Sequence, residues 1–187
     1  MVLFIKNMVC DRCIMVVKQQ LEILGFKVIN PVLGRVGIEP EPDENQLSMI
    51  RSALKLHGFE LIDEKRKQLV EQIKNVIVQM VHYTDPDNIR INYSEYISSQ
   101  LDKDYPYLSS LFSESEDITI EKYIISQKIE KVKELLEYGE LNLNQIALKM
   151  GYSSTAHLSA QFKNVTGITP SGFKSLEAKK RKPLDKV

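Results

Sequence analysis

The hydrophobic pattern of the first 63 residues changes between two periods, so it predicts strands and helices in turn. Short runs of apolar and β-branched residues are typical of strands, and apolar residues three or four positions apart are typical of helices. The expected strands are 3–8, 27–33, 35–38 and 59–62, and the expected helices are 13–24 and 44–57. Gly34 separates two strands, which favours a hairpin, and Gly25 and Gly58 end the helices. The order βαββαβ predicts a ferredoxin-like α+β domain over residues 1–63.

A longer helical pattern follows over residues 64–83, with apolar side chains along one wide face. The segment has fewer than three heptads, which is too short to indicate a coiled coil by itself. Packing against a neighbouring domain and the seam of a homodimer both remain open. Asp85-Pro86 then interrupts the pattern, so we expect a connecting helix and linker over residues 64–86 that couples two domains.

The rest of the chain has a helical pattern in short pieces, which predicts an all-α second half. Asn142 and Gln145 have the spacing of a capping box at the start of one short helix, and Gly151 ends it. A second helix, capped by Ser153 or Ser154, buries Leu158 and Phe162 four positions apart. Two short helices joined by a tight turn are the pattern of a helix-turn-helix.

Three short motifs follow in order: Phe162-Lys163, Gly167-Ile168-Thr169-Pro170 and Phe173-Lys174. In this order the chain resembles the end of the second helix-turn-helix in the AraC/XylS family of transcriptional regulators. Residues 105–112 are similar to the family's first recognition helix, and residues 123–136 to its long joining helix. The resemblance implies a double helix-turn-helix domain over 87–178, followed by a basic tail at 179–187, that binds double-stranded promoter DNA.

Helix geometry and this resemblance together suggest which side chains contact DNA. With Leu158 and Phe162 turned inward, the opposite face of their helix is expected to meet base edges in the major groove. That face consists of Thr155, Ala156, Ser159 and Ala160. The candidates for phosphate contacts are Lys163, Lys174 and Ser154. The candidates in the first helix-turn-helix are Tyr105, Ser109 and Ser110.

The formal net charge is zero, which by itself argues against a nucleic-acid-binding protein. The charge is nevertheless unevenly distributed. Residues 87–140 hold six Lys/Arg against twelve Asp/Glu, whereas residues 141–187 hold eight against two. We therefore expect the second helix-turn-helix to supply most of the DNA affinity. The acidic first one binds DNA weakly or serves another partner, such as RNA polymerase or a second protomer.

The segment Met8-Val9-Cys10-Asp11-Arg12-Cys13 lies between the first strand and the first helix. It resembles the heavy-metal-associated domain of copper chaperones and metal-transporting ATPases, with Asn7 where that family usually has Gly. Two thiolates suit Cu(I), whereas a closed zinc site requires four ligands. The start of the helix is expected to lower the pKa of both thiols. In a βαββαβ fold His57 comes near Cys10, as a third metal ligand or only as a last-turn residue of its helix.

Other function classes fit the sequence less well. Two cysteines are too few for a disulfide framework, and no apolar run approaches the roughly 20 residues of a membrane span, so we expect a cytoplasmic location without membrane contact. A thiol-disulfide enzyme using Cys10 and Cys13 is disfavoured because the expected strands are too few for a thioredoxin fold, so we predict no enzymatic activity. A metallochaperone whose helical half docks a protein partner is the alternative, but it does not need the second helix-turn-helix.

Overall fold

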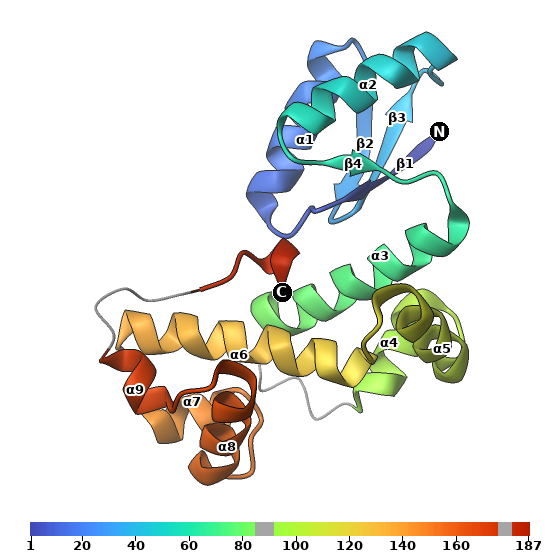
Figure 1. Cartoon of the computed structure of the whole chain (residues 1–187). Helices are drawn as coiled ribbons and strands as arrows, with labels where there is room; N and C mark the ends of the chain where they lie inside the picture. The colour runs from blue at the N-terminus through green and yellow to red at the C-terminus, as the bar shows by residue number, and fades with distance from the viewer. Residues whose placement is uncertain (85–91, 176–180) are drawn as a thin grey trace. The chain divides into compact units, whose positions relative to one another are not determined.

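The computed structural model describes residues 1–84, 92–175 and 181–187 and divides the chain into two compact units, Met1–Val76 and Ile77–Val187 (Figure 1). The last two residues of the expected connecting helix and linker, 85 and 86, lie outside the described residues, as do 179 and 180 of the expected basic tail. No helix in the described part of the chain is long and apolar enough to cross a membrane.

The first unit is an antiparallel sheet with two helices. Its elements are β1 (Val2–Lys6), α1 (Asp11–Ile23), β2 (Lys27–Val32), β3 (Arg35–Glu39), α2 (Glu44–Leu56) and β4 (Glu60–Leu61). The four-stranded sheet has the order β2-β3-β1-β4, so β1 lies between two antiparallel neighbours. In register, Leu3 lies opposite Val36 and Ile5 opposite Leu61. The elements begin and end within a few residues of the predicted ones, but the last strand is shorter than predicted.

The core of this unit forms between the sheet and one face of each helix. Its most deeply buried members are Leu3, Ile5, Met8, Val17, Leu21, Val36, Ile38, Ile50 and Leu54. The two buried residues of each helix are four positions apart, and Leu3 and Ile5 alternate on β1, because these spacings place side chains on one face. The loop between β1 and α1, which ends at Cys10, leads into the first turn of α1, where Cys13 packs against this core.

A long helix, α3 (Lys65–Val78), follows β4 and ends in a π-helical turn, η1 (Gln79–Tyr83). Its first part is tied to the sheet of the first unit. The Asn75 amide packs so closely on the hairpin turn at Gly34 that a Cβ there would collide with it, and Gly34 has φ +72°. The division between the units falls inside α3, within the segment that the sequence predicts as a single connecting helix.

The second unit is helical in its described residues. It contains α4 (Tyr93–Leu101), α5 (Tyr105–Glu116), α6 (Ile120–Tyr138), α7 (Leu143–Lys149), α8 (Thr155–Thr166), α9 (Pro170–Lys174) and a short 3-10 turn, η3 (Leu184–Lys186). The central helix α6 contacts η1, α5, α7, α8 and α9, and Figure 1 shows it running across the unit. It includes all of the predicted joining helix, 123–136, and extends beyond it at both ends.

The core of the second unit joins α6 to the three helices that follow it. Ile129 and Val132 of α6 pack with Ile146, Leu158 and other buried residues. Phe162 is fully buried, and its ring lies edge-on to Phe173 with centroids 5.7 Å apart. Within the same helix, Lys133 forms a buried ion pair with Glu130. Burial on this scale fixes α8 firmly against α6.

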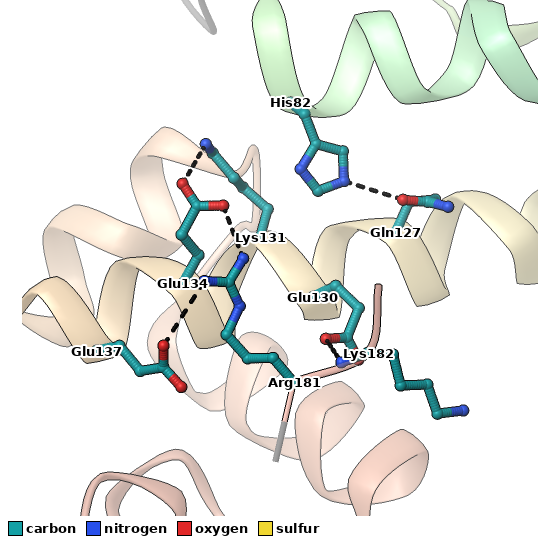
Figure 2. A network of polar contacts seen from close by, with 8 residues as sticks. All are labelled: His82, Gln127, Glu130, Lys131, Glu134, Glu137, Arg181 and Lys182. Atoms are coloured by element: carbon teal, nitrogen blue, oxygen red, sulfur yellow. Dashed lines mark hydrogen bonds and ion pairs between the residues drawn. The ribbon is translucent and has the colours of Figure 1, made fainter. Parts of the chain in front are cut away.

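The C-terminal segment 181–187 lies against α6 (Figure 2). The Arg181 guanidinium contacts Glu134 at 3.1 Å and Glu137 at 3.6 Å, and the Lys182 backbone N–H donates to Glu130 at 3.0 Å. These three carboxylates are three or four residues apart, so they form one acidic stripe on α6. In the described part of the expected basic tail, the Arg181 side chain and the Lys182 backbone are therefore bound to the domain's own central helix.

Candidate nucleic-acid interface

Two short helices joined by a tight turn, α7 and α8, form the candidate interface. The capping box predicted for α7 is confirmed: the Asn142 side chain accepts from the Gln145 N–H at 3.0 Å, and the Gln145 side chain accepts in return at 2.9 Å. Gly151 has φ +70°, which permits the sharp turn. Of the two predicted caps for α8, Ser154 is the one used, because its hydroxyl accepts from the His157 N–H at 3.1 Å.

The two faces of α8 differ sharply in burial. Leu158 and Phe162 are fully buried, which confirms the predicted inner face. On the other side, Ala156 and Ala160 are exposed, and Thr155 and Ser159 are half-buried. This accessible face carries only hydroxyl and methyl groups, which are able to contact base edges and thymine methyls but provide no charge.

Two lysines lie exposed near this face, Lys163 in the last turn of α8 and Lys174 at the end of α9. Neither makes an ion pair with any residue in the described ranges. Unpaired cations of this kind are suited to phosphate contacts, which position a protein on DNA without reading its sequence. The hydroxyl of Ser154, by contrast, already accepts the cap hydrogen bond of its own helix.

The candidate DNA-contacting side chains of the first helix-turn-helix are less free to contact DNA than those of α8. The Tyr105 hydroxyl donates to Glu121 at 2.5 Å, and the Ser110 hydroxyl donates to Glu114 at 2.9 Å. Burial first, and then the hydrogen bond to Glu121, raise the pKa of Tyr105, and the same bond lowers the pKa of the Glu121 carboxyl. Ser109 is half-buried on α5. Two of the three predicted contacts therefore hold hydrogen bonds to carboxylates.

One arrangement in this unit was missed by sequence reasoning. The Lys128 ammonium of α6 lies 5.2 Å from the ring centre of Tyr93 and 5.1 Å from that of Tyr152. The Tyr152 ring also packs edge-on against His157 at 5.3 Å. Burial raises the pKa of Tyr152 to about 12, so its hydroxyl stays protonated. Tyr93, Lys128 and Tyr152 belong to separate segments, and no local spacing in the sequence links them.

The two cysteines of the first unit lie together. Cys10 is the N-cap residue of α1, and the two Sγ atoms are 3.3 Å apart, with both side chains half-buried and free of disulfides. The expectation that the helix start lowers both thiol pKa values is wrong for Cys13. Burial raises the pKa of the Cys13 thiol, and a hydrogen bond with Cys10 adds to the rise, against opposing backbone hydrogen bonds.

The surroundings of the cysteines include the turn before β4. Asn7, which takes the place of the heavy-metal-associated family's Gly, has φ +71°, and its side chain donates to the Gly58 carbonyl at 2.8 Å. The neighbouring His57 is exposed and caps the C-terminal end of α2. In the described ranges no three His, Cys, Asp or Glu side chains gather as a metal-binding group, so the structure does not group His57 with the two thiols.

Residues 97–175 match a family model described as a helix-turn-helix domain. The Msm operon regulatory protein of Streptococcus mutans is 29% identical over 119 residues, which are 64% of this chain and 40% of that protein. The uncharacterized HTH-type transcriptional regulator YtdP of Bacillus subtilis is 24% identical over 117 residues, 61% of this chain and 15% of that protein. The chain thus spans less than half the length of these curated relatives.

Two solved structures are also similar to this chain. The C-terminal domain of the two-component response regulator yesN from Fusobacterium nucleatum is 30% identical, with a TM-score of 0.47, and covers 56% of this chain and 96% of that one. The C-terminal domain of AraT, a response regulator from Geobacillus stearothermophilus, is 24% identical, with a TM-score of 0.49, and covers 59% of this chain and 87% of that one.

The family model spans α7, the turn at Gly151 and α8, whose caps and buried face are those of two short helices joined by a tight turn. Residues 97–175 of this chain are therefore a helix-turn-helix domain.

Proposed function

We propose that the protein is a sequence-specific DNA-binding transcriptional regulator of the AraC/XylS type, in which α8 reads the promoter. The observation that carries this proposal is the two-sided character of α8. Its inner face is fully buried against α6, and its accessible face of small hydroxyl and methyl groups lies near the exposed Lys163. A firmly held helix with such a face matches the way recognition helices enter the major groove. Such a regulator acts in the cytoplasm, which holds a bacterial chromosome.

A salt titration with single substitutions tests this proposal. Lys163→Ala should weaken binding to all duplexes alike and lower the slope of log K against log salt by about one. Thr155→Val and Ser159→Ala should instead change which bases are preferred, by up to about 1–3 kcal/mol per contact. Binding is measured by fluorescence anisotropy, on duplexes that the wild-type protein selects from a random pool.

Lys55→Ala, an exposed lysine on α2 of the first unit, serves as the charge-matched control and should leave Kd unchanged. Variants in the first helix-turn-helix, Ser109→Ala and Ser110→Ala, should cost less than the changes in α8. If they cost more, the proposed asymmetry between the two helix-turn-helix motifs is wrong. A small loss there is the result expected if the first helix-turn-helix serves RNA polymerase or a second protomer.

We also propose that the first unit is a ferredoxin-like domain of the heavy-metal-associated kind and that it makes the regulator responsive to a soft metal ion. The strand and helix order of β1 to β4, with β1 and β3 at the centre of the sheet, supports the fold. The pair of thiols at the start of α1 supports the ligand. The loop that leads from β1 to the two thiols begins at Asn7, whose backbone N–H donates to Glu71 of α3 at 3.2 Å. Since α3 extends past the unit boundary to Val78, this contact offers a route towards the second unit.

The donor set fits Cu(I) better than Zn(II). Cys10 and Cys13 would hold the ion, and two sulfurs 3.3 Å apart need only small rotations to bind one soft cation. A closed zinc site would require further ligands, which the described residues do not gather around these thiols. When bound, the ion would displace the thiol protons and stabilise the thiolate form of both cysteines, which would offset the burial that keeps Cys13 protonated.

Competition titrations decide the metal proposal. Wild-type protein should take Cu(I) from a chelator, and the variant with both Cys10→Ser and Cys13→Ser should not. His57→Ala is the matched control in the same unit and should bind as wild type does, because His57 only caps α2. Equal Cu(I) affinity in the wild type and the double serine variant would refute the site. The metallochaperone alternative, in which the helical half docks a protein partner, predicts copper binding without specific DNA binding, which the same samples test by anisotropy.

A further inference from the structure

A cavity of about 360 Å³ opens between the π-helical turn η1, α6 and the turn that joins α7 to α8. Its walls all belong to the second unit. Met80, Leu135 and Met150 supply apolar wall, and the backbone of Gly151 closes one side. The volume lies within the usual range for small-molecule sites. The cavity has no role in the DNA contacts proposed above.

The charge of this cavity is one-sided. Lys128, Lys131 and Lys149 line it, and among the lining residues that the structure describes there is no Asp or Glu. Lys131 pairs with Glu134 at 3.0 Å, but Lys128 and Lys149 make no ion pair with any residue that the structure describes. The Lys128 ammonium is held over Tyr93, which also lines the cavity. A divalent cation does not suit such a site, whereas an anion would satisfy two unpaired ammonium groups.

The mouth of the cavity is apolar and exposed. Leu148 is 80% exposed and Tyr83 is 51% exposed, although both are large hydrophobic residues. Large apolar side chains that are exposed beside a cavity are typical of a site where the apolar part of a ligand covers them. The ligand therefore needs an apolar body as well as a negative group.

The surrounding elements connect the cavity to α8. Its lining includes residues 148–151, which end α7 and form the turn that orients α8, and Tyr152 N–H then bonds the Ala147 carbonyl at 2.9 Å. On the other side is η1, where Thr84 N–H bonds the Gln79 carbonyl five residues back at 3.1 Å. Single π-helical turns are rare and occur frequently at functional sites.

We propose that this cavity binds a small organic anion with an apolar body, such as an aromatic or aliphatic carboxylate, and that its binding strengthens the grip of α8 on DNA. The carboxylate pairs with Lys128 and Lys149, and the apolar body covers Leu148 and Tyr83. By joining η1 and α6 to the turn before α8, the ligand would hold that turn in one conformation. DNA binding would then cost less conformational entropy, because the turn before α8 is already ordered. The binding half of the proposal rests on the cavity alone, and the effect on DNA rests on the proposed function.

The test uses the full chain and two probe pairs, 4-phenylbutyrate with 4-phenylbutanamide and octanoate with octanamide. Calorimetry should show that each carboxylate binds at least about tenfold tighter than its neutral amide, because only the anion pairs with the lysines. Lys149→Gln should lose most of this preference. Since Lys149 is exposed, the variant is expected to fold normally. Lys128→Gln should lose it as well, and Lys122→Gln, an exposed lysine of α6 outside the cavity, should keep it.

If a carboxylate and its amide bind with equal affinity, or if neither binds, the proposed site is wrong. Saturating carboxylate should also tighten DNA binding by about fivefold, and DNA should tighten carboxylate binding by the same factor. Carboxylate binding with no change in DNA affinity would overturn the regulatory half of the proposal. A protein that binds carboxylate but no DNA at all would instead refute the proposed function and leave the site standing.

Discussion

Replacing Phe162 by alanine should cost the second unit about 3–5 kcal/mol of its free energy of unfolding. The ring is fully buried and packs on Phe173, which itself is 2% exposed, so truncation leaves a cavity where α6, α8 and α9 meet. The surrounding helices are capped at both ends and are not free to collapse into the space. DNA binding should be lost with the fold rather than through any missing contact.

The loss of stability can be measured in the second unit alone. All eight tyrosines lie beyond residue 76 and the chain has no Trp, so tyrosine fluorescence in urea follows the second unit. Val165→Ala on the same helix is the control, since Val165 is 46% exposed, and it should change stability by no more than about 0.5 kcal/mol. If the two variants unfold at the same urea concentration, the packing of α8 described above is incorrect.

Removing Glu130 should have the second largest effect, about 3 kcal/mol, because it leaves the Lys133 ammonium buried without its carboxylate. Glu130 is 4% exposed and Lys133 7%, and Glu130 also accepts the N–H of Lys182. Glu130→Ala thus loses an ion pair and a contact to the C-terminal segment together. The same tyrosine signal in urea reports the change.

A double-mutant comparison separates the pair from the packing. Glu130→Leu combined with Lys133→Met should recover most of the lost stability, since replacing a buried pair by apolar residues is often close to neutral. Glu137→Ala, which removes only a partly exposed contact to Arg181, should cost about 0.5 kcal/mol or less. If the losses of unfolding free energy in the single variants at positions 130 and 133 simply add in the double variant, the two side chains do not form a buried ion pair.

Much of the fold could be predicted because its signals are local. Asn142 and Gln145 are three residues apart, Gly151 sits at the turn, and the buried pair Leu158 and Phe162 is one helical turn apart. Each depends on neighbours in the chain, so spacing alone is informative. The strands followed from short β-branched runs for the same reason. The last strand was predicted too long because only two of its residues pair with β1.

The features that escaped prediction join distant segments. Lys128 meets Tyr93 and Tyr152 across three elements, and Tyr105 reaches Glu121 on the next helix. The raised pKa of Cys13 has the same origin, because its burial comes from the packing of the whole unit rather than from the helix start. Charge counts along the sequence could not tell that Arg181 is paired, since its partners lie on α6.

The docking of Arg181 on the acidic stripe of α6 alters how ionic strength should act on this protein. Counterions condensed on DNA are released only by cations that reach phosphates. A guanidinium already neutralised by Glu134 and Glu137 releases none while it stays there. The excess of positive charge counted along the C-terminal sequence therefore overstates the polyelectrolyte contribution. Exposed lysines such as Lys163 and Lys174 contribute to it directly, and Arg181 takes part only after leaving α6, in competition with that helix's own carboxylates.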